Sequence, residues 1–336
     1  MTQVITKREH WVPLELLYVI GIIAISFSSI FIRWSDANVS AIAMYRLYLT
    51  DLLLLPLALR HYRALLNIPL RAWLMLALSG IMLALHFLLW MGSLRLTTVA
   101  SSTVILTLEP IMVVIGSYFL FKTRTNRFMI IGMALAVIGS IAIGWGDFKV
   151  SGTAFQGDML SFFGTIAVAI HMLISKQVRA HMDALVYNFW VFFMAATVLA
   201  VYNLINDVPF TGYDARDWGV FWLLALVPTL FGHYLFNWLL KYMNAGAVSM
   251  AVLGEPVFSS LLAFWLLGEA LTGMQLGAGT LILIGVWIFI QFGNEKEETL
   301  VPPDIMAPEH EPGDDSDISG SSDATTSSLQ AEISKK

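Results

Sequence analysis

The sequence contains no cysteine and little charge. The missing cysteine excludes disulfides, thiolate metal sites, iron–sulfur clusters and a cysteine nucleophile. Charged residues make up 13% of the 336 residues, whereas they make up about a quarter of an ordinary soluble domain. No basic patch is present, so the composition does not indicate a nucleic acid as a partner.

Hydrophobic residues are abundant instead. They form 57% of the chain, and the mean hydropathy is +0.73, which indicates an integral membrane protein. The apolar runs do not alternate with a period of two, so helices are the spanning element that they favour. We predict ten transmembrane helices, at residues 16–32, 41–59, 73–92, 97–120, 128–145, 159–175, 186–205, 219–240, 246–267 and 272–291.

Basic residues are unevenly distributed between the two sets of predicted loops. With ten spans, both termini lie on one side of the bilayer. The loops and termini on that side carry twelve Lys and Arg residues near the span ends, and the opposite loops carry four. Because Lys and Arg accumulate on the cytoplasmic side, we expect a multi-pass protein of the cell membrane with both termini in the cytoplasm.

The chain repeats itself weakly at an offset of 146 residues. This offset superposes Glu109-Pro110 on Glu255-Pro256, and Gly139 on Gly285. Each repeat has five spans, an odd number, so the second half enters the membrane inverted relative to the first. Inverted repeats are typical of secondary transporters, which bind their substrate near the midplane between the halves.

These features predict five segments. The last of them, from residue 293 onward, holds 11 acidic and 3 basic residues, and its Ser- and Pro-rich composition predicts disorder. In order, we expect a cytoplasmic N-terminus (1–15), a first repeat (16–145), an external linker (146–158), a second repeat (159–291) and an acidic cytoplasmic tail (292–336).

Several motifs resemble the EamA-type branch of the drug/metabolite transporter superfamily. They are the Glu-Pro pair in each fourth helix, the segment MYRLYLTDLLLLPLAL (44–59) and the segment LGEALTGMQLGAGTLILIGVWI (267–288). The first half departs from the pattern, because Lys122-Thr123 stands where the second half has Gly268-Glu269. The resemblance covers roughly residues 15–292. It implies ten helices, a cavity lined by the third, fourth, eighth and ninth, and transport of amino acids, other metabolites or drugs, often outward.

Glu109 and Glu255 are the first candidates for substrate or proton binding. A carboxylate in mid-membrane costs about 2.5–3.5 kcal/mol on insertion scales and therefore needs a partner, a cavity or a pathway. Pro110 and Pro256 follow them and predict helix kinks. Arg46 lies in the second span, where it would neutralise Glu109 or bind a substrate carboxylate. The alternative interpretation is structural, with each Glu tying a kink to a neighbouring helix and Arg46 in a buried ion pair.

Two further pairs of polar and aromatic residues share a helix face. His86 and Trp90 are four residues apart in the third span, and His233 and Asn237 are four apart in the eighth. Aromatic rings with His and Asn side chains would suit an organic ligand that needs stacking and hydrogen bonds. Packing within the bundle explains each histidine equally well.

Small residues spaced by four occur in the fifth span, from Gly132 to Gly144, and in the tenth, at Gly273 and Gly277. Such spacing allows close helix approach, either within one chain or in a homodimer.

The sequence thus predicts a transporter, not an enzyme, for small organic metabolites such as amino acids. We expect an exporter that works by alternating access, either driven by an ion gradient with proton coupling or facilitative. The substrate and the lipid bilayer are its expected partners, and no cofactor or metal is expected. A multidrug or cation exporter is the alternative, and an intramembrane enzyme is a remote one, since the chain has no HExxH, GxSxG or Walker A motif.

Overall fold

A computed structural model describes residues 13–97, 99–144, 152–267 and 273–293. Several predicted segments therefore lie outside the described residues. They are most of the N-terminus, residues 145–151 at the junction of the first repeat and the linker, the Gly268-Glu269 segment and nearly all of the acidic tail. The chain divides into two units, Met1–Met306 and Ala307–Lys336, and the second unit lies wholly outside them.

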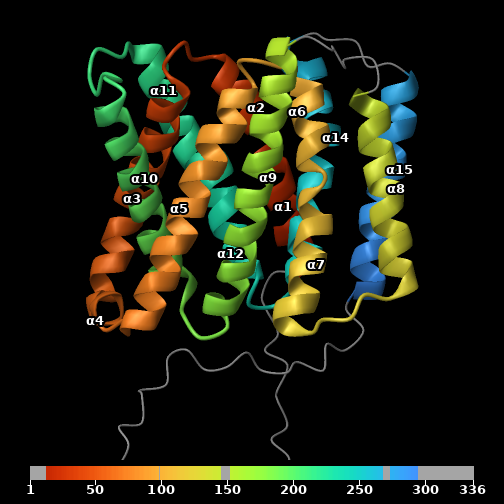
Figure 1. The fold of residues 1–336 in the computed structure, drawn as a ribbon, viewed down its shortest axis with the longest axis horizontal. Helices are drawn as coiled ribbons and strands as arrows, with labels where there is room; N and C mark the ends of the chain where they lie inside the picture. Colours follow the sequence, from red (N-terminus) through yellow and green to blue (C-terminus); the bar gives the residue numbers. More distant parts are fainter. Residues whose placement is uncertain (1–12, 98, 145–151, 268–272, 294–336) are drawn as a thin grey trace, which may run out of the picture. The chain divides into compact units, whose positions relative to one another are not determined.

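The first half folds into five helical spans, two of which are broken (Figure 1). A short helix, α4, follows the second span. In chain order the helices are α1 (Leu14–Ser26), α2 (Ser28–Arg33), α3 (Val39–Arg60), α4 (Tyr62–Leu66), α5 (Leu70–Ser93), α6 (Val99–Leu106), α7 (Glu109–Phe121) and α8 (Arg127–Gly144).

The second half repeats this order of five spans, with a π-helical stretch in its third and a break in its fourth. Its first helix begins at Gly152, within the segment predicted as the linker. The helices are α9 (Gly152–Arg179), α10 (Ala184–Ile205), α11 (Ala215–Leu224), the π-helix η1 (Ala225–Tyr234), α12 (Leu235–Leu239), α13 (Ala245–Ser249), α14 (Ala251–Leu267) and α15 (Gly273–Gly293).

The predicted all-α membrane fold is confirmed. Nine helical segments among the described residues are long and apolar enough to cross a bilayer. The predicted fifth span is the apolar helix Arg127–Ala142, which is shorter than the others within the described part of the chain. The fold has ten helical spans in two inverted five-helix repeats.

Equivalent residues begin the second span of each half. Asn38 accepts a hydrogen bond from the Ser40 N–H at 3.0 Å and caps α3. Asp183 accepts one from the Leu185 N–H at 2.8 Å and caps α10. An Asn or Asp side chain at this position satisfies a backbone donor that the first helical turn leaves unpaired. The same local chemistry therefore starts the equivalent helix in both halves.

The contacts between helices follow the symmetry of the two repeats. A contact from a helix of the first half to a helix of the second has a counterpart in which the roles of the two halves are reversed. The third span packs on the sixth (α5 on α9), and the eighth packs on the first (η1 on α1). The second span packs on the seventh (α3 on α10), the fourth on the ninth (α7 on α13) and the fifth on the tenth (α8 on α15). Figure 1 shows the α3–α10 pair and the α8–α15 pair on opposite sides of the view. The packing thus supports the two-repeat architecture independently of the sequence similarity.

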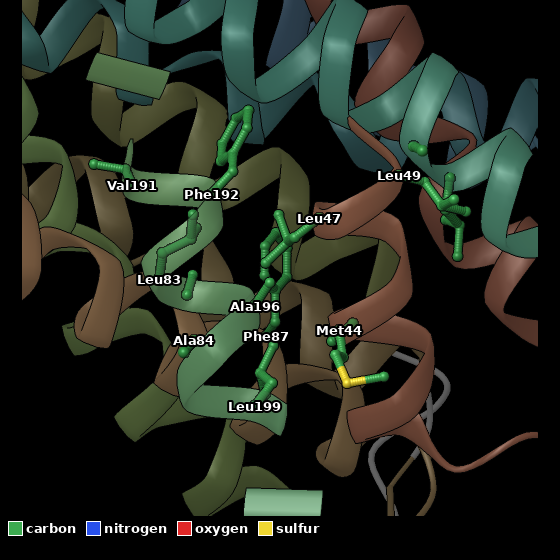
Figure 2. Close-up of a cluster of buried hydrophobic side chains, with 14 of the residues drawn as sticks. Met44, Leu47, Leu49, Leu83, Ala84, Phe87, Val191, Phe192, Ala196 and Leu199 are labelled. Atoms are coloured by element: carbon green, nitrogen blue, oxygen red, sulfur yellow. The ribbon is translucent and has the colours of Figure 1, made fainter. Parts of the chain in front are cut away.

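Apolar side chains of α3, α5 and α10 form much of one buried cluster. Phe87, Tyr187, Phe192 and Leu47 are at most 1% exposed. Figure 2 draws members of this cluster from the three helices. Phe87 belongs both to this cluster and to the wall of the cavity described below, so the packing of α3 and α10 fixes one side of that cavity.

Glycines allow α8 and α15 to approach closely within one chain. A Cβ atom on Gly285 would lie 2.4 Å from the Gly132 carbonyl oxygen, and one on Gly139 would lie 2.8 Å from that of Ala278. Small residues of the fifth span therefore pack against the tenth span of the same chain. Gly273 and Gly277 have no described atom within 4 Å of the position of an added Cβ.

Candidate functional site

A cavity lies between the two halves, near the middle of the helices. The space not occupied by atoms is about 670 Å³, a figure that includes the open side of the cavity. Its wall is mainly apolar and aromatic, with a few polar side chains. The lining residues are Ile25, Ser28, His86, Phe87, Trp90, Leu106, Glu109, Val168, His171, Met172, His233, Phe236, Asn237, Val248, Val252 and Glu255.

Much of the cavity wall consists of equivalent positions from the two repeats, which are 146 residues apart in the sequence. In five pairs of positions separated by 146, both members line the cavity. The cavity therefore lies across the interface of the repeats. The pairs are Ile25 with His171, Phe87 with His233, Trp90 with Phe236, Leu106 with Val252, and Glu109 with Glu255.

Six of the seven residues predicted to bind substrate or protons lie on this wall. Only Arg46 does not line the cavity. The six are Glu109, Glu255, His86, Trp90, His233 and Asn237.

A helix break presents Glu109 to the cavity. The fourth span is interrupted at Thr107–Leu108, and α7 begins at Glu109 with Pro110 in its first turn. Proline fits the first turn of a helix because the backbone N–H that it lacks would have no partner there. The predicted kink at Pro110 is thus realised as a full interruption of the helix directly before the glutamate.

The second half breaks its fourth span at a different place. The interruption is at Met250, between α13 and α14. Pro256 lies inside the continuous helix α14, so the break precedes this proline by six positions. Glu255 consequently sits on a continuous helix, whereas Glu109 sits at a helix start.

Both glutamates are buried without a complete set of partners. Glu109 is 1% exposed and Glu255 is 7% exposed. The Oε1 atom of each has no hydrogen-bond partner among the described residues. Buried carboxylate oxygens normally have a partner, so these two oxygens are exceptions that need an explanation.

Arg46 lies directly behind the cavity wall. Its Nε donates to Thr229 Oγ1 at 2.9 Å and its Nη1 to Ser28 Oγ at 3.4 Å. Its guanidinium carbon lies 4.4 Å from the centre of the Phe87 ring. Arg46 is 0% exposed, and its Nη2 has no partner in the described part of the chain.

Arg46 is held by η1 and α2, which carry Thr229 and Ser28. Which carboxylate Arg46 would neutralise, Glu109 or another, stays a prediction.

Three histidines line the cavity, and each is held differently. His86 Nδ1 lies 3.1 Å from the Gly164 carbonyl oxygen, and the ring stacks on Trp90 with centres 5.9 Å apart. His171 Nδ1 lies 2.9 Å from Ser79 Oγ. The His233 ring meets the Phe87 ring edge-on at 5.2 Å. Among the described residues, no group of three or more His, Asp or Glu side chains is arranged to hold a metal ion.

A buried polar network holds Asn237 in place. Its Nδ2 donates to Asn188 Oδ1 at 2.8 Å. Its backbone carbonyl accepts a hydrogen bond from Arg179 Nε at 2.9 Å. Arg179 is 1% exposed and also donates to the Met182 carbonyl. Arg179 is one of the twelve basic residues counted above near the span ends, and the structure buries it at the end of α9.

Sequence reasoning missed His171 and the π-helix. His171 gave the same signal as His86, a histidine inside an apolar span. The signal for η1 was Pro228, a proline inside the eighth span. Thr229, which follows it, bonds back to the Leu224 carbonyl at 2.7 Å and also holds Arg46.

The sequence match to a known family covers both halves of this architecture. The model of the EamA-like transporter family matches residues 13–145 and again residues 155–291. The chain belongs to the EamA-like transporter family. The double match follows the division into two repeats, with one match on each side of the cavity.

Individual relatives of this EamA-family chain are transporters by name. A Salmonella typhimurium protein named "Probable amino-acid metabolite efflux pump" is 28% identical over 54% of this chain and 63% of its own length. The Bacillus subtilis transporter YoaV is 25% identical over 53% of this chain and 62% of its length. The chain thus spans somewhat less than two thirds of these two relatives. An Archaeoglobus fulgidus transporter is 24% identical over 82% of this chain and 95% of its length.

A solved crystal structure shares the fold. It superposes with a TM-score of 0.72 at 16% sequence identity, over 83% of this chain and 97% of the other. This likeness supports the fold alone. Together, the family match and the apolar helices show a multi-pass membrane protein of the EamA-like transporter family.

Proposed function

We propose that this chain is a secondary transporter, in the exporting direction, for small zwitterionic metabolites such as amino acids. The observation that carries the proposal is one cavity between the two halves, lined by a buried glutamate from each half with an unpartnered oxygen. The name of the Salmonella relative agrees with this substrate class.

The free polar atoms match the two charged ends of an amino acid. Glu109 and Glu255 offer acceptor oxygens for an ammonium group. The indole N–H of Trp90 is buried without a partner among the described residues, and so is Arg46 Nη2. These two donors would suit a carboxylate, with Arg46 reached by a side-chain movement of Phe87 or Ser28. Apolar residues such as Val168 and Met172 would contact the substrate's side chain.

Alternating access would follow from the inverted repeats. Rocking of one five-helix half against the other would expose a fixed central site to each side of the membrane in turn. Protonation of a glutamate in one state and release in the other would couple transport to a proton gradient. In this proposal both chain termini are cytoplasmic, as the distribution of basic residues predicts.

A multidrug or cation exporter is the second candidate. Among the described residues no Lys or Arg lines the cavity, and the aromatic rings of Trp90, Phe87 and Phe236 do. Carboxylates with aromatic rings bind organic cations. The zwitterion is favoured over the cation because the buried Arg46, directly behind the wall, would offset the charge of one of the two carboxylates.

A panel of radiolabelled solutes in proteoliposomes tests the proposal. The panel contains neutral amino acids, quaternary ammonium compounds and sugars, each with and without a pH gradient. Amino-acid flux above that of empty vesicles supports the proposal. Flux of quaternary ammonium compounds alone supports the second candidate. Turnover of a lipid or peptide without any solute flux would overturn both.

A further inference from the structure

A second hollow lies on the outer surface of the helix bundle, away from the central cavity. It is a groove of about 930 Å³ of open space along the second half of α7 and the turn that follows it. We propose that this groove binds one anionic phospholipid, with the acyl chains along α7 and the phosphate at the basic turn. The lining residues are Val114, Ile115, Tyr118, Phe119, Arg124 and Thr125.

The wall of the groove on α7 is suited to an acyl chain. Ile115, Tyr118 and Phe119 are 53%, 54% and 67% exposed on an apolar helix long enough to span the membrane, so they would face lipid. The Tyr118 and Phe119 rings meet edge-on with centres 5.5 Å apart. Since α8 packs on α6, α14 and α15, it leaves this face of α7 open although it is the next helix in the chain. Figure 1 shows α8 standing with α15, apart from the lower part of α7.

The turn at the end of the groove carries only positive charge. Residues 122–127 read Lys-Thr-Arg-Thr-Asn-Arg, with three cations and no acid. Lys122, Arg124 and Arg127 are all exposed. Lys122 has a left-handed backbone, with φ of 57°, and ends α7. The chain therefore turns sharply, so that the three cations gather at the end of the span.

The turn is also fixed in place. Asn126 Nδ2 donates to the Phe292 carbonyl oxygen at 2.7 Å, and Asn126 Oδ1 accepts from the Met129 N–H at 2.9 Å. The Phe128 ring stacks on Phe292 with centres 4.5 Å apart. A basic turn that is held against α15 offers a pre-arranged anion site and loses little freedom on binding.

Charge decides between the occupants of this groove. A zwitterionic lipid would use its apolar wall but would gain little from three cations. An anionic lipid satisfies both the apolar wall and the basic turn, as polybasic segments at membrane surfaces do in general. A free phosphate would use the turn and leave the apolar wall exposed.

Lipid retention in native mass spectrometry tests this site. The purified full chain is loaded with phosphatidylglycerol or phosphatidylcholine of matched acyl chains, and the lipid-bound fraction is measured. We expect phosphatidylglycerol to be retained over phosphatidylcholine. The double variant Lys122→Gln/Arg124→Gln should reduce its retention about tenfold, because each basic residue near a membrane surface strengthens anionic-lipid binding severalfold.

The chain offers a matched control at the same end of the bundle. Arg60 and Arg63 are exposed cations at the end of α3 and in α4, without this groove. If phosphatidylglycerol binds through the general excess of basic residues, Arg60→Gln/Arg63→Gln will reduce retention as much as the first variant, and the proposal fails. It fails as well if Lys122→Gln/Arg124→Gln retains the lipid fully, or if glycerol phosphate displaces it.

Circular dichroism and elution volume check that each variant is folded. Should the double variant not fold, Phe119→Ala replaces it as a test of the apolar wall. Reduced retention of phosphatidylglycerol in this variant supports the groove, and unchanged retention contradicts it.

Discussion

The two halves of the cavity share their backbone positions but only some of their chemistry. Glu109 and Glu255 are identical at the paired positions, and Leu106 and Val252 are similar. In contrast, Ile25 is paired with His171 and Phe87 with His233, and Trp90 with Phe236. The fold is thus repeated, whereas the recognition groups are divided between the halves.

This difference has a physical reason in the proposed mechanism. A site that is opened from either side by movement of either half needs its charged group at the same depth in both halves. Recognition of a chiral solute needs different groups on its different faces. Identical carboxylates with dissimilar neighbours satisfy both needs.

The carboxylates provide the largest expected effect. Glu255→Gln and Glu109→Gln remove a charge with little change of size. We expect each to lower solute flux by about ten- to a hundredfold, since a charged hydrogen bond is worth roughly 1.5–3 kcal/mol. Flux in proteoliposomes is the measurement, with membrane insertion unchanged. Glu15→Gln, at an exposed glutamate of α1, is the control, and wild-type flux in Glu255→Gln would remove Glu255 from the mechanism.

The helix contact at the fifth and tenth spans tests the symmetric side of the comparison. Gly139 and Gly285 are 146 apart, and each faces the backbone of the opposite helix at under 3 Å from an added Cβ. We expect Gly139→Ala and Gly285→Ala each to destabilise the folded protein by about 1–3 kcal/mol through overpacking. Thermal unfolding in detergent measures this. Gly277→Ala, with open space around it, should leave the midpoint unchanged. Equal midpoints for all three variants would show that α8 and α15 do not pack as described.

Arg179 and Arg33 test the asymmetric side, because they are also 146 apart. Arg179 is buried and bonds two backbone carbonyls, whereas Arg33 is exposed. Arg179→Gln should therefore cost about 1–3 kcal/mol of stability by leaving buried acceptors unpaired, and Arg33→Gln should cost little. The measurement is the thermal unfolding midpoint of each variant in detergent. Similar shifts of the midpoint in both variants would contradict the asymmetry.

The smallest expected effect concerns recognition. His233→Phe gives the second half the residue that the first half has at Phe87. We expect the apparent affinity for the transported solute to fall about three- to tenfold, as a net hydrogen bond of roughly 1 kcal/mol is lost. The measurement is flux against solute concentration. An unchanged affinity would assign His233 to packing against Phe87 rather than to recognition.

The sequence predicted the fold almost completely, because apolar runs and a shared Glu-Pro pair are local signals. It also predicted six of the residues that line the cavity. It did not predict the hydrogen bond from Arg46 to Thr229, since that bond depends on how η1 is positioned across the repeat interface. His171 was missed although it gave the same signal as His86, a histidine inside an apolar span. The burial of Arg179 was missed because burial at a helix end depends on packing with α12, which hydropathy does not show.

Thiol accessibility of the paired wall positions tests the central claim most directly. The chain has no cysteine of its own, so Leu106→Cys, Val252→Cys and Val113→Cys each carry a single thiol. Val113 is 0% exposed, lies in the packed core and does not line the cavity. A small water-soluble thiosulfonate should modify the first two and not the third. Modification of neither, or of only one half's position, would contradict a shared cavity between the repeats.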